Sequence, residues 1–184
     1  MNKHFAAKRI DYIGQQLRSG WAKETFGLEG DCIVSFIGEC DVKPEYMVDL
    51  VDLQEESRIY SPLMLHFIVE HSGADLEKGV LRQRLLAAIA GEYLRSETGL
   101  LIIREGDDLY LEKRKISVSV ATVSPVSTLI HFGINILTKD VPVPACGLEE
   151  LGLEPDVTAH RLMESYVTEL TSAEKARTSA RPVS

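Results

Sequence analysis

The 184-residue chain is poor in cysteine. Its three cysteines, Cys32, Cys40 and Cys146, cannot all pair with one another, and no C-x-x-C motif is present. The spacing therefore argues against a zinc ribbon, and we assign no metal site. Free thiols are typical of a reducing compartment, so we predict a cytoplasmic protein.

The chain also lacks long apolar runs. No segment approaches the roughly 20 apolar residues that a membrane-spanning helix needs. The N-terminal segment MNKHFAAKRIDYIG has no uninterrupted apolar core of the kind found in secretion signals. We therefore expect no membrane partner.

Basic residues are in deficit. Twenty Lys and Arg side chains stand against 28 Asp and Glu, which gives a net charge of −8. Non-specific nucleic-acid binding depends on neutralising phosphates with Lys and Arg, so we expect no nucleic-acid partner. What the chain does contain is 45% hydrophobic residues, enough to build one hydrophobic core at this length.

The hydrophobic pattern predicts one α+β domain over residues 1–170, with a mixed, largely antiparallel sheet and packed helices. Apolar runs rich in β-branched residues indicate strands, and amphipathic runs indicate helices. The expected strands are Ala7–Ile13, Cys32–Ile37, Leu63–Glu70, Leu100–Arg104, Leu109–Leu111, Ile116–Val123 and Leu129–Leu137. The expected helices are Lys43–Glu56, Asp75–Ser96 and Asp156–Leu170, with a helical turn at Gly147–Gly152 and a polar, disordered tail over Thr171–Ser184.

Some single residues follow from these patterns. In the Asp75–Ser96 helix, the periodicity places Leu81 on the buried stripe and Gln83 on the solvated side. His66 and His71 flank a predicted strand. We interpret both as structural or solvent-facing, because no converging metal ligands accompany them.

The stretch Gly106–Gly147 carries the most chemistry. It includes an Asp-Asp pair before a strand, a lysine at the start of the next strand, a Gly-Ile-Asn strand and a Pro-Ala-Cys-Gly turn. Asp107-Asp108-Leu109-Tyr110-Leu111 and Arg114-Lys115-Ile116-Ser117 resemble the catalytic-lysine segment of biotin protein ligases and lipoate ligases. Gly133-Ile134-Asn135-Ile136 resembles their Gly-apolar-Asn strand, and Pro144-Ala145-Cys146-Gly147-Leu148 resembles the Pro-Cys-Gly-Ile turn of lipoyl (octanoyl) transferases. As a whole, the chain resembles the family catalogued as domain of unknown function 366.

This resemblance implies a biotin/lipoate ligase-like fold and acyl or carboxylate transfer through a Cys/Lys pair. Lys115 would be a base or a carbonyl-binding cation. Cys146 would be a nucleophile with a depressed pKa, activated by the nearby lysine. The substrate-binding residues implied by the resemblance are Arg18, which matches an arginine before glycines, Asp108, Asn135, and His131, which is offset by one position from the transferase histidine.

The glycine-rich nucleotide-binding signature of biotin ligases and the Arg-Arg-x-Ser-Gly-Gly-Gly run of lipoate ligases are both absent. Their absence favours transfer without ATP, and no cofactor is specified. The expected partners are a small carboxylic acid or acyl thioester, held in an apolar channel with one polar end, and an acyl-carrier or acceptor protein.

Two alternatives stay open. The chain is a non-catalytic domain that binds a small carboxylate or nucleotide, with Cys146 an ordinary buried cysteine, or it is a structural module that forms oligomers through a sheet edge. For the Lys115 segment by itself, the alternative to a catalytic lysine is an ordinary hairpin with a charged turn, since Lys113, Arg114 and Lys115 are all basic.

Overall fold

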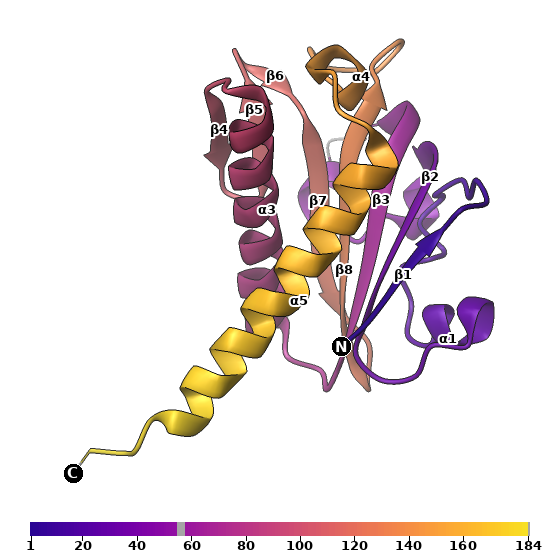
Figure 1. Ribbon diagram of the computed structural model, residues 1–184. Helices are drawn as coiled ribbons and strands as arrows, with labels where there is room; N and C mark the ends of the chain where they lie inside the picture. Colours follow the sequence, from indigo (N-terminus) through magenta and orange to yellow (C-terminus); the bar gives the residue numbers. More distant parts are fainter. Residues whose placement is uncertain (55–57, 184) are drawn as a thin grey trace.

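A five-stranded mixed sheet, in the order β1-β2-β3-β8-β7, organises the protein (Figure 1). The computed structural model describes residues 1–54 and 58–183. β1 runs parallel to β2, and the other neighbouring pairs are antiparallel. The predicted α+β fold with a mixed, largely antiparallel sheet is therefore confirmed. The strands are β1 (Asn2–Ala6), β2 (Cys32–Val42), β3 (Ile59–Ser72), β8 (Ser127–Leu137) and β7 (Ser117–Val123).

Strand β8 gives the sheet two different faces. Successive side chains of a strand point to opposite sides. Ile130, Phe132 and Ile134 enter the main hydrophobic core, whereas His131 and Asn135 line a pocket on the other side. The strand is buried along nearly its whole length, so one element supports both the core and the site.

Helices α3 (Leu76–Thr98) and α5 (Pro155–Ser179) cross the core face of the sheet (Figure 1). The Asp75 side chain caps α3 by accepting a hydrogen bond from the Lys78 amide at 3.0 Å, and Gly99 ends it in a left-handed conformation. Each fully buried large apolar side chain stabilises the fold by about 1.5–3 kcal/mol. The helix residues buried in this core include Leu86, Ala87, Ala90, Leu94, Leu162, Met163 and Tyr166.

The opposite face is covered by the segment after β1, by α1 (Trp21–Phe26), and by residues following β2. Tyr12, Trp21, Phe36 and Met64 belong to a second buried cluster there. Gly38 permits this packing, because a Cβ at that position would overlap the Ile10 carbonyl oxygen. After β2 come the 3-10 turn η1 (Pro44–Tyr46) and the short helix α2 (Leu50–Gln54).

A separate three-stranded sheet packs beside α3. It consists of β4 (Ile102–Glu105), β5 (Asp108–Leu111) and β6 (Arg114–Lys115). Glu112 and Lys113 both have positive φ, as a two-residue hairpin turn requires. Lys115 then forms a bridge to Ala145, just before α4 (Leu148–Leu151).

Two predicted elements are wrong. The first strand is Asn2–Ala6, not Ala7–Ile13, because residues 7–13 form an irregular stretch that stays beside β2 through bonds from the Ile10 amide to the Ile37 carbonyl and from the Tyr12 amide to the Glu39 carbonyl. The predicted helix Lys43–Glu56 is divided into η1 and α2, since Met47 is extended. Its last residues, Glu55 and Glu56, lie outside the described residues.

The two long helices also differ in detail from expectation. Leu81 on α3 is 62% exposed, whereas Gln83 is 5% exposed, so the expected assignment of these two positions is reversed. Helix α5 continues past Leu170 to Ser179 and projects away from the body (Figure 1). In the part of the chain that the structure describes, no helix combines the length and apolar character of a membrane span.

Candidate functional site

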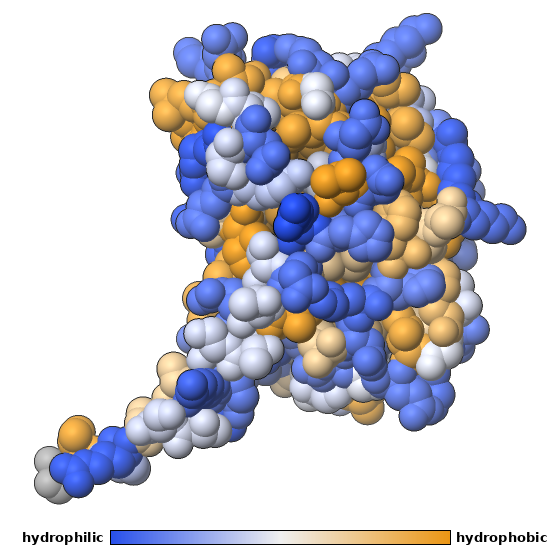
Figure 2. Space-filling view, in the orientation of Figure 1, coloured by the Kyte–Doolittle hydropathy of each residue, from blue (hydrophilic) through white to orange (hydrophobic). Residues whose placement is uncertain are grey.

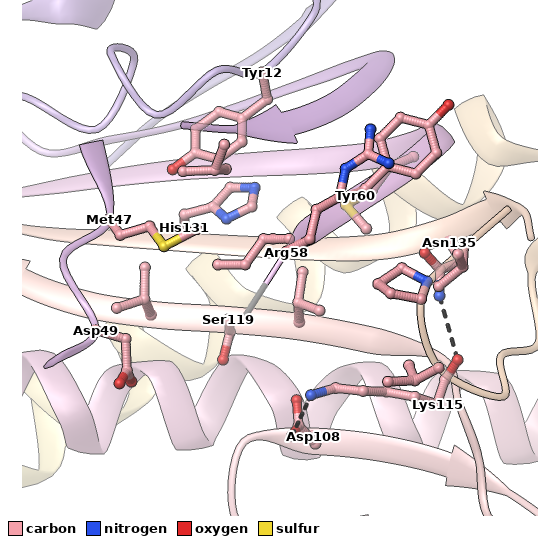
Figure 3. A pocket seen from close by; sticks show the side chains of 18 of the residues that line it. Tyr12, Met47, Asp49, Arg58, Tyr60, Asp108, Lys115, Ser119, His131 and Asn135 are labelled. Carbon is pink, nitrogen blue, oxygen red and sulfur yellow. Dashed lines mark hydrogen bonds and ion pairs between the residues drawn. The ribbon is translucent and has the colours of Figure 1, made fainter. Parts of the chain in front are cut away.

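A cavity of about 410 Å³ lies on the face of the sheet opposite α3 and α5 (Figure 3). Its volume falls in the range of small-molecule sites. Polar groups come from several separate strands, and most of the remaining wall is apolar. The apolar lining includes Val42, Met47, Ile59, Met64, Val118 and Val120.

Charged side chains in the cavity include an ion pair between Lys115 and Asp108, and Asp49, Arg58 and Asp107 also line it. The Lys115 ammonium lies 2.8 Å from Asp108 Oδ2, and the two side chains are 27% and 23% exposed. Figure 3 shows the lysine side chain running along the cavity wall toward Asp108. Burial raises the pKa of the Asp108 carboxyl, and the nearby Lys115 opposes that rise.

A second network fixes the turn that carries this pair. Asp107 Oδ2 accepts hydrogen bonds from Gln83 Nε2 and Ser119 Oγ, each at 2.8 Å, and Gln83 Nε2 is 2.8 Å from Ser119 Oγ. Arg84 adds an ion pair to Asp107 at 3.0 Å. Helix α3 therefore holds the Asp107–Asp108 turn against β7. Gln83 and Ser119 were missed as site residues. No local sequence pattern distinguishes a side-chain amide or hydroxyl that is buried in a hydrogen-bond network from one that faces solvent.

Asn135 connects β8 to the backbone of Lys115. Its side-chain Nδ2 donates to the Lys115 carbonyl oxygen at 3.2 Å, and its backbone N–H donates to the Ile116 carbonyl oxygen at 2.9 Å. The side chain also lines the cavity. Asn135 thus fixes the strand segment from which the Lys115 side chain extends.

His131 forms a stacked, hydrogen-bonded group with His66 and Tyr12. His131 Nε2 lies 3.1 Å from His66 Nδ1, and the His131 ring stacks on Tyr12 with centroids 3.8 Å apart. Burial lowers the pKa of His66 to about 3 and holds the pKa of His131 well below its usual value. Both rings are therefore neutral, and His131 contributes to the wall of the cavity.

Cys146 is close to Lys115 only through the backbone. The Cys146 amide donates to the Lys115 carbonyl at 3.0 Å, but its side chain is fully buried in the main core and is not among those lining the cavity. Burial and then the charge of Glu150 raise the thiol pKa to about 11. The expected depressed pKa is therefore wrong, because the thiol is buried among apolar side chains with an acidic neighbour.

Arg18 lies elsewhere. Its guanidinium pairs with Glu24 on α1 and does not line the cavity. The structure thus brings Lys115, Asp108, Asn135 and His131 to one cavity, and leaves out Arg18 and Cys146. Across residues 1–54 and 58–183, no three His, Cys, Asp or Glu side chains converge as metal ligands would.

The fold resembles that of protein ligases. A biotin protein ligase from Aquifex aeolicus, solved with biotin, is 15% identical with a TM-score of 0.62, over 93% of this chain and 70% of that one. A candidate lipoate protein ligase from T. acidophilum, solved with lipoic acid, is 14% identical with a TM-score of 0.60, over 93% and 86%. At these identities the likeness shows the fold alone.

A much closer match is a protein of unknown function from Pyrococcus horikoshi. It is 41% identical with a TM-score of 0.96, over 100% of this chain and 99% of that one. Residues 1–181 match the sequence model of a single family. The chain belongs to the family described as Domain of unknown function (DUF366) and has a biotin/lipoate ligase-like fold.

Proposed function

We propose that the protein binds a small carboxylic acid, or its acyl thioester, in the Lys115 cavity. The observation that carries this proposal is the Lys115–Asp108 pair in a cavity that also has an apolar wall, which includes Met64, Val118 and Val120. The carboxylate or carbonyl oxygen would face the ammonium, and the tail would lie against Val118, Val120 and Met64.

Electrostatics supports an acid as the ligand. Hydrogen bonds between an ammonium and a carboxylate are about twice as strong as neutral ones, and partial burial reduces their screening by water. A ligand oxygen would join or replace Asp108 as an acceptor for Lys115. Burial raises the pKa of Asp108, and this cost to its charged form supports replacement by a ligand oxygen.

The comparisons supply a chemical precedent for the ligand. The similar folds from Aquifex aeolicus and T. acidophilum were solved with biotin and with lipoic acid, and both ligands are carboxylic acids with a ring-bearing tail. We extend this ligand class to the present chain as part of the proposal.

A second candidate function is acyl transfer without ATP, with an acyl-carrier or acceptor protein as the partner. In this step an acceptor amine attacks the thioester carbonyl, the C–S bond breaks, and the thiol leaves with a proton from the amine. The Lys115 ammonium favours it, because a cation at the carbonyl oxygen stabilises the negative charge that develops there. Cys146 has no part in this scheme, since its thiol is buried with a raised pKa.

The unpaired Cys32, Cys40 and Cys146 support location in a reducing compartment such as the cytoplasm.

Binding is tested by titrating octanoate, lipoate, biotin and ATP into the wild type and Lys115→Gln, followed by calorimetry and native mass spectrometry. We expect at least one acid to bind, and Lys115→Gln to weaken it about tenfold or more, the size of a charge-assisted hydrogen bond. Lys113→Gln, an exposed position in the same hairpin turn, is the matched control and should bind normally.

Failure of every acid to bind, or unchanged binding in Lys115→Gln, would refute the acid site. Tight ATP binding with no bound acid would overturn the ATP-independent scheme. Thiol release from octanoyl-coenzyme A in the presence of an acceptor domain separates the two functions: a transferase releases thiol, and a binding domain does not.

A further inference from the structure

The hydrogen-bond geometry fixes which nitrogen of each buried histidine carries a hydrogen. His66 Nε2 lies 3.3 Å from the Gly38 carbonyl oxygen, and a carbonyl can only accept, so this nitrogen carries the hydrogen. A neutral ring has one N–H, which leaves His66 Nδ1 as an acceptor. His131 Nε2, 3.1 Å away, must therefore be the donor.

The same reasoning leaves His131 Nδ1 as an acceptor with a lone pair. Among the described residues no hydrogen bond reaches this atom. Within that part of the chain, Thr158 Oγ1 is the one fully buried side-chain nitrogen or oxygen that lacks a partner. Because His131 Nδ1 also lacks a partner but is not in this class, the atom is at least partly accessible. His131 is 3% exposed, and the space it borders is the cavity. The Tyr12 ring stacked on it fixes its orientation.

His131 is placed to meet the tail of a ligand. It shares a face of β8 with Gly133 and Asn135, and its Cα lies roughly 13 Å along the strand from that of Asn135. Gly133 leaves room between them, into which the Met64 side chain packs, because a Cβ at Gly133 would overlap Met64 Sδ. Figure 3 shows His131 across the cavity from the Lys115–Asp108 pair.

We propose that His131 determines specificity: its Nδ1 accepts a hydrogen bond from an N–H or O–H group on the tail of the bound acid. This inference rests on the proposed function. It narrows the ligand from any apolar carboxylic acid to one whose tail carries a hydroxyl, amide or urea donor. A plain hydrocarbon tail would displace water from Nδ1 and leave a buried acceptor unpaired, which costs affinity.

The tautomer is measured first, on the wild type, with long-range ¹H–¹⁵N NMR of the histidine rings. We expect the Nε2–H form for both His66 and His131 at pH 7. A His131 ring with its hydrogen on Nδ1 would overturn the inference without any ligand. Adding an acid with a tail donor should shift the His131 Nδ1 resonance, and adding octanoate should not.

Ligand selectivity is measured next by calorimetry. ω-Hydroxyoctanoate is compared with octanoate, and desthiobiotin, which carries a cyclic urea, with lipoate. The donor-bearing acid of each pair should bind about fivefold tighter, the net effect of one hydrogen bond. His131→Phe, which keeps a ring against Tyr12, should abolish that preference, and His131→Gln, which keeps an acceptor, should retain it.

The outcomes separate this inference from the proposed function. If no acid binds to the wild type, the proposed function fails and the inference fails with it. If both acids of each pair bind equally, the acid site stands and the role of His131 is refuted. A preference that persists in His131→Phe also refutes it, because the donor would then meet a different acceptor.

Discussion

Single residues show that adjacent backbones need not place side chains together. Lys115 and Cys146 are joined through backbone hydrogen bonds, as expected from their order in the sequence. Their side chains have separate environments: the ammonium meets Asp108 at the cavity, and the thiol is in the core. Spacing along the chain predicted the first relation and had no means to predict the second.

The raised thiol pKa values give a residue-scale prediction. Burial raises the pKa of Cys32 and Cys146 to about 11 and that of Cys40 to about 12. Because the thiolate is the reactive form, iodoacetamide at pH 7.5 should label all three at least about tenfold more slowly in the folded protein than in urea. Mass spectrometry of labelled peptides measures each rate. Rapid labelling of Cys146 alone in the folded protein would restore its role as a nucleophile.

The candidate site was predicted in part at this scale. Lys115, Asp108, Asn135 and His131 were singled out by their resemblance to ligase and transferase motifs. The structure brings them to one cavity from two different sheets, Asp108 and Lys115 from β5 and β6 and the other two from β8. Gln83 was not singled out, since its bonds to Asp107 and Ser119 join residues 24 and 36 positions away. Arg18 was assigned from a loop motif, and its actual partner, Glu24, lies on the first helix after that loop.

At the scale of elements, the strands that alternate were predictable and the irregular segments were not. The predicted runs Leu109–Leu111, Ile116–Val123 and Leu129–Leu137 match β5, β7 and β8 closely, because β-branched residues and burial agree there. β1 was missed, since it has only a short apolar end, Phe5-Ala6, and an exposed start. Its place depends on parallel pairing with β2, which no local pattern reveals.

Helix α5 gives an element-scale prediction. Residues 171–183 are exposed, and Figure 2 shows a largely hydrophilic surface on the projecting end. Truncation after Thr171 should therefore change the free energy of unfolding by no more than about 0.5 kcal/mol, measured by urea denaturation. Tyr166→Phe is the contrast, because it removes a hydrogen bond to buried His71 at 3.2 Å and should cost about 1 kcal/mol. A large loss on truncation would mean that the arm packs against a partner, such as a second copy of the chain.

At the scale of the whole molecule, the neutral histidine pair connects the site to overall stability. His66 and His131 lie between the second hydrophobic cluster and the cavity, where burial lowers both pKa values. Burial keeps the His131 ring neutral, so that its Nδ1 can accept a hydrogen bond from a ligand. The same burial disfavours protonation of the folded protein. The Asp31 carboxyl behaves differently: burial opposes its ionisation, but hydrogen bonds from Ser72 and His71 outweigh burial and lower its pKa. Its stabilising effect is therefore lost only below about pH 4.

Stability should therefore fall as the pH drops below about 6.5. Below that value, the unfolded chain binds protons at His66 and His131 that the folded protein does not, because burial lowers both pKa values, that of His66 to about 3. Proton binding lowers the free energy of the unfolded state, so the fold loses stability. Each such histidine costs about 1.4 kcal/mol at one pH unit below 6.5, or about 3 kcal/mol for the pair at pH 5.5. Urea denaturation at pH 7.5, 6.5 and 5.5 measures the slope. The double variant His66→Gln, His131→Gln should reduce the slope, and the part that remains comes from His71, whose pKa burial also lowers. His160→Gln, at an exposed position, is the control. Equal stability of the wild type at pH 7.5 and 5.5 would show that the pair is protonated in the fold and cannot offer a neutral Nδ1 to a ligand.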